Sequence, residues 1–213
     1  MMAPKNSVLL AAILLASNLT SARADQTPVN QTLETQSSLK SVNIEVSPLS
    51  AMVGVYGVDA TIGVSDHVAV GPTLSYYNVS GLLVSGFFED ARATGYSVGT
   101  KAKFFLSGPR FTDSWVVSPS VSYISLHCVG TLIDFFSASN RPSFSKDESA
   151  TIAGAVVGHE WYYSSGISLG ALVGASYYYE NAGQTQYSDG MTRSYSARSG
   201  VALALQFNLG YTF

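Results

Sequence analysis

A regular alternation of apolar with small or polar residues runs through the end of the chain. Every second position between residues 201 and 213 is apolar, namely Val201, Leu203, Leu205, Phe207, Leu209, Tyr211 and Phe213. The positions between them hold Ala, Gln, Asn, Gly and Thr. A period of two residues is that of a β-strand with one apolar face. The stretch also exceeds the about 9–11 residues that a tilted strand needs to cross a membrane.

The same alternation recurs along the chain and predicts eight strands. We place them at residues 39–47, 53–64, 67–78, 93–106, 114–126, 150–163, 166–179 and 196–213. Short connections alternate with long ones, which fall at residues 79–92, 127–149 and 180–195. This alternation is typical of outer-membrane barrels, which have short periplasmic turns and long outer loops. The sequence therefore predicts an all-β fold, an eight-stranded antiparallel up-and-down transmembrane β-barrel. The pairing of the first hairpin stays open because Pro48 interrupts it.

The first residues predict export from the cytoplasm. Lys5 precedes an apolar run at residues 8–16, and the small residues Ala22 and Ala24 mark a cleavage site. The run is too short for a membrane anchor, which needs about 20 residues in a helix. The expected organisation is a cleaved signal peptide at residues 1–24, a flexible periplasmic linker at 25–38 and an outer-membrane β-barrel at 39–213.

The composition limits the partners of the chain. Asp and Glu number 14 against 11 Lys and Arg, so no basic stripe is present to neutralise phosphates, and nucleic acid is not an expected partner. The single cysteine, Cys128, excludes a disulfide within the chain. The 13 Tyr, 10 Phe and 19 Gly, together with only 12% charged residues, are typical of a strand-rich membrane protein.

The outward-facing aromatic residues fall at two levels of the predicted strands. Those near the long loops are Tyr76, Tyr96, Tyr123 and Tyr177, and those near the short turns are Phe104, Trp115, Trp161, Tyr211 and Phe213. Amphipathic rings favour both membrane interfaces. We therefore expect two aromatic girdles and a location in the bacterial outer membrane.

Charged residues occupy positions that face the inside of the predicted barrel. They are Glu45, Asp59, Lys101, Lys103 and Glu160, with Arg198 as a further candidate. An eight-stranded barrel is filled by its own side chains, and buried opposite charges pair. We expect one ion network near the periplasmic mouth, in which loss of Lys101 partly rescues loss of Glu160. A gated path for protons or small ions is the alternative.

The candidate chemistry is sparse. His127 lies near the outer rim beside Ser125 and Cys128, and Asp134 follows in the same loop, so a Ser–His–acid or Cys–His set is conceivable there. No recognised lipase motif surrounds these residues. The three histidines fall at different ends of the strands, which argues against a metal site. We expect no enzymatic activity, no cofactor and no metal.

The last residues, LALQFNLGYTF, resemble the terminal signature of bacterial outer-membrane barrels. The resemblance implies that Phe207, Tyr211 and Phe213 are read by the barrel-assembly machinery, with periplasmic chaperones as further partners during biogenesis. Strand number and length resemble the small eight-stranded group of the OmpA membrane domain, OmpX and opacity-type proteins. The segment VNIEVSPLSAMVGVYGVDATIGVSDHVAVG resembles the opening of barrels of this general type. The resemblance covers residues 39–213, and we expect no C-terminal peptidoglycan-binding domain.

The function expected from these features is that of a non-enzymatic outer-membrane β-barrel with a structural or surface-interaction role through its extracellular loops. Its expected partners are outer-membrane lipid and lipopolysaccharide, and a monomer is expected. The first alternative is a narrow pore for small ions or solutes. The second alternative is a barrel enzyme that modifies lipid A.

Overall fold

The computed structural model describes residues 41–80, 88–132 and 143–213, and these residues are almost entirely β-structure. The predicted signal peptide and linker lie outside the described residues. The elements are β1 (Val42–Val46), α1 (Pro48–Met52), β2 (Val55–Ser65), β3 (Val68–Ser80), β4 (Phe88–Phe105), β5 (Ser114–Leu132), β6 (Ser143–Tyr162), β7 (Ile167–Glu180), β8 (Gly183–Tyr187), β9 (Thr192–Tyr195) and β10 (Arg198–Thr212). No helix among these residues has the length and apolarity to cross a membrane.

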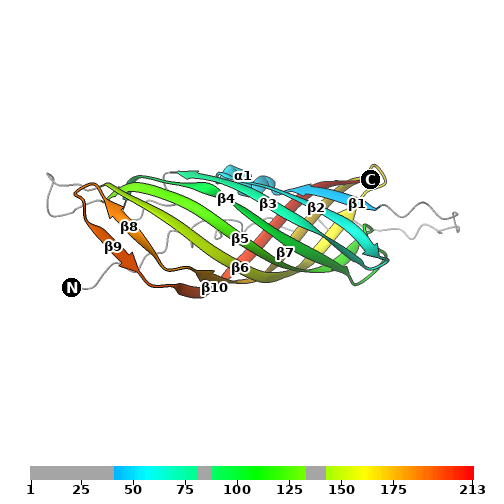
Figure 1. The fold of residues 1–213 in the computed structure, drawn as a ribbon. Coiled ribbons are helices and arrows are strands. Elements are labelled where there is room, and N and C mark those ends of the chain that lie inside the picture. The colour runs from blue at the N-terminus through cyan, green and yellow to red at the C-terminus, as the bar shows by residue number, and fades with distance from the viewer. Residues whose placement is uncertain (1–40, 81–87, 133–142) are drawn as a thin grey trace, which may run out of the picture.

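Eight of the strands pair antiparallel into a ring (Figure 1). Their order is β5-β4-β3-β2-β1-β10-β7-β6, and β5 also pairs with β6, which brings the order back to its start. Ring strands that follow one another in the chain are neighbours in the ring, with the β8–β9 hairpin inserted between β7 and β10, so the topology is up-and-down. The all-β, antiparallel, eight-stranded arrangement predicted from the alternation is confirmed.

The register explains why the sequence alternates. Along β10, Leu203 and Leu209 are exposed on the outside of the ring, whereas Asn208 and Thr212 are buried inside. Successive side chains of a strand point to opposite faces, so one register fixes all of them. Glycine allows neighbouring strands to approach closely inside the ring. A Cβ added at Gly158 of β6 would lie 2.0 Å from the carbonyl oxygen of Ala171 in β7.

Two of the predicted connections contain more strand than expected. β5 continues to Leu132 and β6 begins at Ser143, so much of the predicted loop 127–149 is a paired extension of these two strands. β4 likewise begins at Phe88. The outward residues of the extension, such as His127 and Asp147, are polar. The alternation with apolar residues therefore stops earlier in the sequence than the strands do, so the predicted strands were too short.

The third predicted loop, residues 180–195, holds the hairpin of β8 and β9. β8 pairs with the first part of β6 through Phe144↔Tyr187 and Lys146↔Thr185, so the hairpin lies beside the extension at one end of the ring (Figure 1). Together these strands make that end of the molecule longer than the turns at the opposite end. We predicted a loop for this segment because most of its residues are polar and show no apolar alternation.

The first hairpin is short and contains the only described helix. β1 pairs with β2 from Val42↔Ile62 to Val46↔Val58, and the chain then forms the single turn α1. Pro48 is the first residue of α1, where its missing N–H costs no hydrogen bond. The interruption that Pro48 predicted is therefore a helical turn, and it ends β1 after five residues.

Candidate functional site

Lys103 lies at the centre of a charged cluster inside the ring. Its Nζ is 2.5 Å from Oε1 of Glu45 and 2.8 Å from Oε1 of Glu160. The three residues come from β4, β1 and β6, and their side chains are no more than 3% exposed. Burial removes the water that would otherwise stabilise these charges, so the ion pairs must replace it.

Lys101 extends the cluster along the same face of β4. Its Nζ is 2.7 Å from Oδ2 of Asp59 and 3.5 Å from Oε2 of Glu45. The two lysines are two residues apart, a spacing that places both on the inward face of one strand. The structure thus brings all five charged residues named from the sequence into one interior network, which comprises Glu45, Asp59, Lys101, Lys103 and Glu160.

The pairing inside the network differs from the expected one. We expected Lys101 to balance Glu160, but Lys103 is the lysine that contacts Glu160. The network holds three carboxylates and two ammonium groups, so it carries one excess negative charge when all are ionised. Asp59 is the carboxylate that keeps contact with solvent, with 28% of its side chain exposed.

Three neutral side chains complete the network, and sequence reasoning missed them. Asn43 donates to Oε1 of Glu45 at 2.8 Å, and Asn208 donates to Oε2 of the same residue at 3.5 Å. The Tyr162 hydroxyl donates to Oε2 of Glu160 at 2.5 Å. Asn43 and Tyr162 each lie two residues from the carboxylate they support. The spacing of two residues, which puts both side chains on the same face of the strand, is the signal that could have identified Asn43 and Tyr162.

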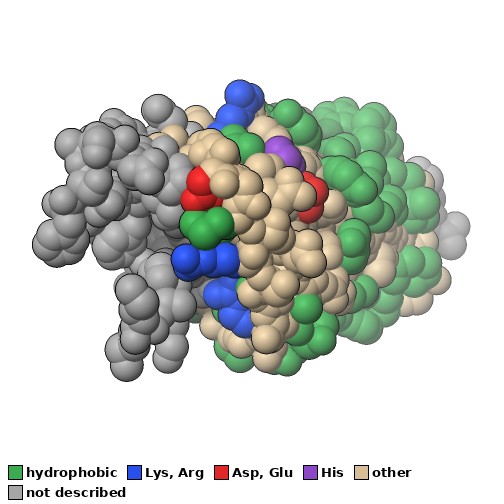
Figure 2. Space-filling model, turned by 60° about the vertical axis from the view of Figure 1, so that its left-hand side comes forward, with side chains coloured by type: hydrophobic (Ala, Val, Ile, Leu, Met, Phe, Trp, Pro, Cys, Tyr) green, Lys and Arg blue, Asp and Glu red, His purple; other side chains and the backbone are tan. Residues whose placement is uncertain are grey.

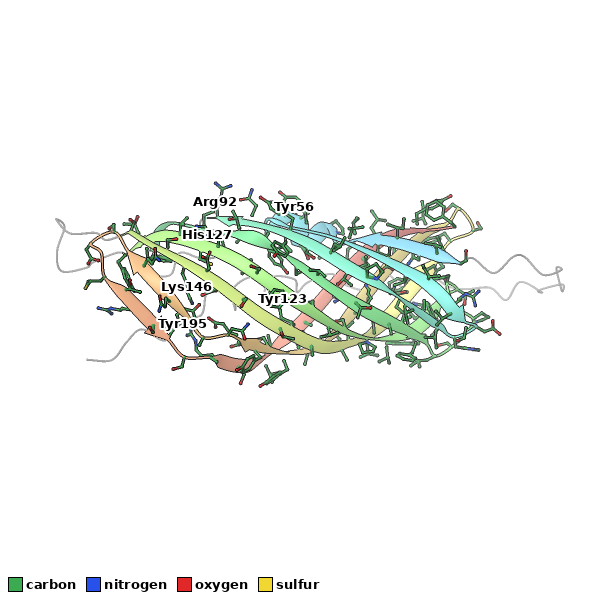
Figure 3. The ribbon with its side chains drawn as sticks, in the orientation of Figure 1. Tyr56, Arg92, Tyr123, His127, Lys146 and Tyr195 are labelled. Carbon is green, nitrogen blue, oxygen red and sulfur yellow. The ribbon has the colours of Figure 1, made fainter. Side chains whose placement is uncertain are left out.

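A second charged cluster lies inside the extended end of the ring. Lys146 contacts the carboxylate of Glu148, lies 3.3 Å from Oε1 of Glu180, and has its Nζ 3.8 Å from the centre of the Tyr195 ring. Arg198, the further candidate from the sequence, lies 3.4 Å from Oε1 of Glu180. Burial raises the pKa of Tyr195. Figure 3 shows Lys146 and Tyr195 near the β8–β9 end, with Tyr123 closer to the middle.

The candidate catalytic set does not form as the sequence suggested. Nδ1 of His127 is 2.7 Å from Oδ1 of Asp147, on the outside of the ring and with both side chains at least half exposed. Cys128 points into the ring and is 3% exposed, so a Cys–His set is wrong. Asp134 lies outside the described residues. Within the described chain, no hydroxyl is recorded in hydrogen-bond contact with His127.

The predicted girdle residues are exposed on the outer surface of the ring. Tyr76 and Tyr96 form one row with Tyr56, which was not predicted as a girdle residue, because the three are register partners across β2, β3 and β4, and each is at least half exposed. The other predicted members are exposed as well, namely Tyr123, Tyr177, Phe104, Trp115 and Trp161. At the opposite end the rings of Tyr211 and Phe213 pack 4.9 Å apart, and Phe207 is also exposed.

No group of three His, Cys, Asp or Glu side chains suited to a metal ion occurs in the described part of the chain. Comparison of the chain with protein-family models, curated proteins and solved structures gave no match.

Proposed function

We propose that the protein is an outer-membrane β-barrel without enzymatic activity, with a structural role or a role in surface contacts through its extended end. The observation that carries this proposal is the outer surface of the ring. Large apolar side chains stay exposed there on all eight strands of the ring, for example Ile62, Leu74 and Val173 at 46–53%. In water such a continuous apolar surface is unfavourable, whereas hydrocarbon solvates it.

The spacing of the aromatic rows supports a lipid environment. Tyr96 and Phe104 on β4 are eight residues apart, as are Trp115 and Tyr123 on β5. At about 3.3 Å per residue this is about 26 Å along the strand, and tilt reduces it to about 20 Å across the membrane. The apolar belt of outer-membrane barrels is about 25 Å tall. Figure 2 shows hydrophobic side chains set back from the extended end, whose surface is largely polar.

The interior supports a role without solute flow. The charged network lies next to an apolar cluster of Phe105, Phe111 and Val116, whose side chains are at most 3% exposed. Eight strands enclose just enough space for such side chains to fill. A role in surface contacts therefore falls to the extended end. We further propose that Phe207, Tyr211 and Phe213 are read by the barrel-assembly machinery, and that lipid and lipopolysaccharide surround the apolar belt.

Fluorescence quenching by brominated lipid tests the proposal. Protein refolded into vesicles should show strong tryptophan quenching when the acyl chains are brominated near the headgroup, because Trp115 and Trp161 are exposed on the outside near one interface. Trp115→Phe and Trp161→Phe variants separate the two signals. Bromine at the ends of the acyl chains should quench less. Equal emission with and without bromine, or an unfolded protein in vesicles, would overturn the proposal.

A further inference from the structure

A cavity of about 470 Å³ lies at the extended end, where β5, β6 and β8 are paired side by side (Figure 1). This volume is within the range of about 300–1,000 Å³ that is usual for ligand sites. The outward side chains that line it are Val129, Thr131, Ser143, Ser145, Gln186 and Ser188. They form rows across the three strands, since Ser145 is the register partner of both Val129 and Gln186. The cavity is therefore on the outer face of the sheet.

The lining of this cavity is polar but uncharged. Hydroxyl groups come from Thr131, Ser143, Ser145 and Ser188, and an amide comes from Gln186. Within the described chain, no hydrogen bond is recorded for the side chains of Thr131, Ser145 and Gln186. Hydroxyl and amide side chains both donate and accept hydrogen bonds. The cavity therefore offers several donors and acceptors to a ligand.

The β8 wall of the cavity is fixed in place by contacts on both faces. On the inner face, Nζ of Lys146 is 3.8 Å from the centre of the Tyr195 ring, and the Tyr195 hydroxyl donates to the main-chain oxygen of Asp147 at 3.0 Å. On the outer face, the N–H of Ser188 donates to the carbonyl oxygen of Ser143 at 2.9 Å, and the N–H of Ser143 donates to the Ser188 hydroxyl at 3.1 Å. A ligand therefore binds without first ordering the hairpin, which lowers the entropy cost of binding.

The chemistry of the lining selects among classes of ligand. A charged ligand needs an opposite charge, and none of the lining residues carries one. An apolar ligand needs apolar walls, but Val129 is the one aliphatic side chain that lines the cavity. An added peptide strand needs free main-chain groups, but β6 is paired here with β5 on one edge and with β8 on the other. A sugar ring fits the lining best, because its hydroxyl groups donate and accept like those of Ser and Thr.

We propose that this cavity binds an uncharged saccharide. The sugar hydroxyls exchange hydrogen bonds with Thr131, Ser145 and Gln186, and a C–H face of the sugar packs on Val129. The proposal rests on the proposed role in surface contacts and names the chemistry of the partner. Such a saccharide can come from lipopolysaccharide beside the barrel or from the glycans of another cell, and both sources share the uncharged sugar ring.

Saturation-transfer NMR tests the proposal on the whole chain refolded in a phosphocholine detergent, whose headgroup contains no sugar. Two sets of probes distinguish the sources. The first set is uncharged O-chain fragments released from lipopolysaccharide, and the second is oligosaccharides of mannose, galactose and glucose. At least one set should show saturable transfer at concentrations up to about 10 mM. The set that binds identifies the source.

Substitutions on β8 locate the binding. Gln186→Leu removes the amide from the cavity and should weaken binding at least tenfold. Gln184→Leu is the matched control and should bind like the wild type, because Gln184 is exposed on the same strand but does not line the cavity. Both variants change an exposed side chain, so both should refold, which the heat-dependent mobility on a detergent gel checks.

Absence of saturable transfer with both probe sets would overturn the proposal. Equal binding by the wild type and Gln186→Leu would also overturn it. If Gln186→Leu does not refold, Ser145→Ala provides the same comparison on β6, and binding that is unchanged in it counts against the proposal. The lipid-quenching experiment is read separately, so failure of saccharide binding leaves the proposed membrane location standing, and absence of quenching leaves the saccharide result standing.

Discussion

Lys103 and Glu160 meet inside the ring with 2.8 Å between Nζ and Oε1, although β5 separates their strands. The contact therefore crosses the interior instead of following the wall. Lys103 also holds Glu45 of β1, so a single ammonium group ties three strands together. The network carries one excess negative charge when all its groups are ionised. Removal of the Lys103 ammonium group should therefore destabilise the protein more than removal of one carboxylate charge.

Lys103→Met should destabilise the protein strongly. The substitution leaves Glu45, Asp59 and Glu160 with Lys101 alone, and we expect the free energy of unfolding to fall by about 3–5 kcal/mol. Urea unfolding in lipid vesicles, followed by tryptophan fluorescence, measures it. Val98→Met puts the same side chain on the exposed face of β4 and should change little.

Glu160→Gln should cost much less than Lys103→Met. It removes the excess negative charge and keeps an amide that can still contact Tyr162, so we expect a loss of about 1 kcal/mol. In the Lys103→Met background the same change should recover part of the lost stability. A Glu160→Gln variant less stable than Lys103→Met would show that the charge count does not control the network.

Phe213 should matter more for assembly than for folded stability. Its ring is 63% exposed, while its main chain accepts from Ser41 and donates to Val42. Phe213→Ala keeps both main-chain bonds and should refold in detergent with nearly wild-type stability. In cells the variant should accumulate in the periplasm, as fractionation and surface labelling would reveal. Wild-type surface levels would contradict the proposed role in assembly.

The protein should not conduct ions in planar bilayers. Lys103 and Glu160 meet across the interior and are at most 1% exposed, so we expect these side chains to block a continuous path of water. Single-channel recording at 1 M KCl should stay at baseline for the wild type. Discrete openings that disappear in preparations without the protein would favour the pore alternative.

Loss of His127 should leave lipid A unchanged. The His127–Asp147 pair is the one observation that favours the enzyme alternative, but no hydroxyl is recorded in contact with His127 among the described residues. Mass spectra of lipid A from cells that express wild type or His127→Asn should be identical to each other and to those of cells without the protein. A mass change lost in His127→Asn would establish the enzyme alternative.

The alternation of residues was sufficient to predict the ring and its inward charges. Each side chain of a strand points either inward or outward, and the direction alternates along the chain. Because Ala102 and Phe104 are apolar and were placed outward, Lys101 and Lys103 were predicted to point inward. Which carboxylate each lysine contacts depends on strand stagger around the ring. The stagger is the sum of the register shifts between several neighbouring strands. The alternation within one strand carries no information about these shifts. This is why Glu160 was assigned to Lys101 instead of Lys103.

The extended end escaped prediction for a different reason. Its strands have polar residues outside, such as His127 and Asp147, and charged residues inside, such as Lys146 and Glu148. Because both faces are polar, the sequence shows no alternation of apolar and polar residues in this segment. The segment was therefore predicted to be a loop. The hydrogen bonds of β5 with β6 continue there because main-chain pairing requires register and not apolar side chains.

The short β1 has a consequence for the order of folding. β7 and β10 share 14 register pairs, whereas β1 and β10 share four. Asn43 and Thr212 meet across that seam although 169 residues separate them in the chain. Loop closure makes such distant contacts slow to form, and a seam of four pairs contributes little until the other strands are in place. Hairpins should therefore form first, the seam between the first and last strands should close last, and on heating it should be the first to reopen.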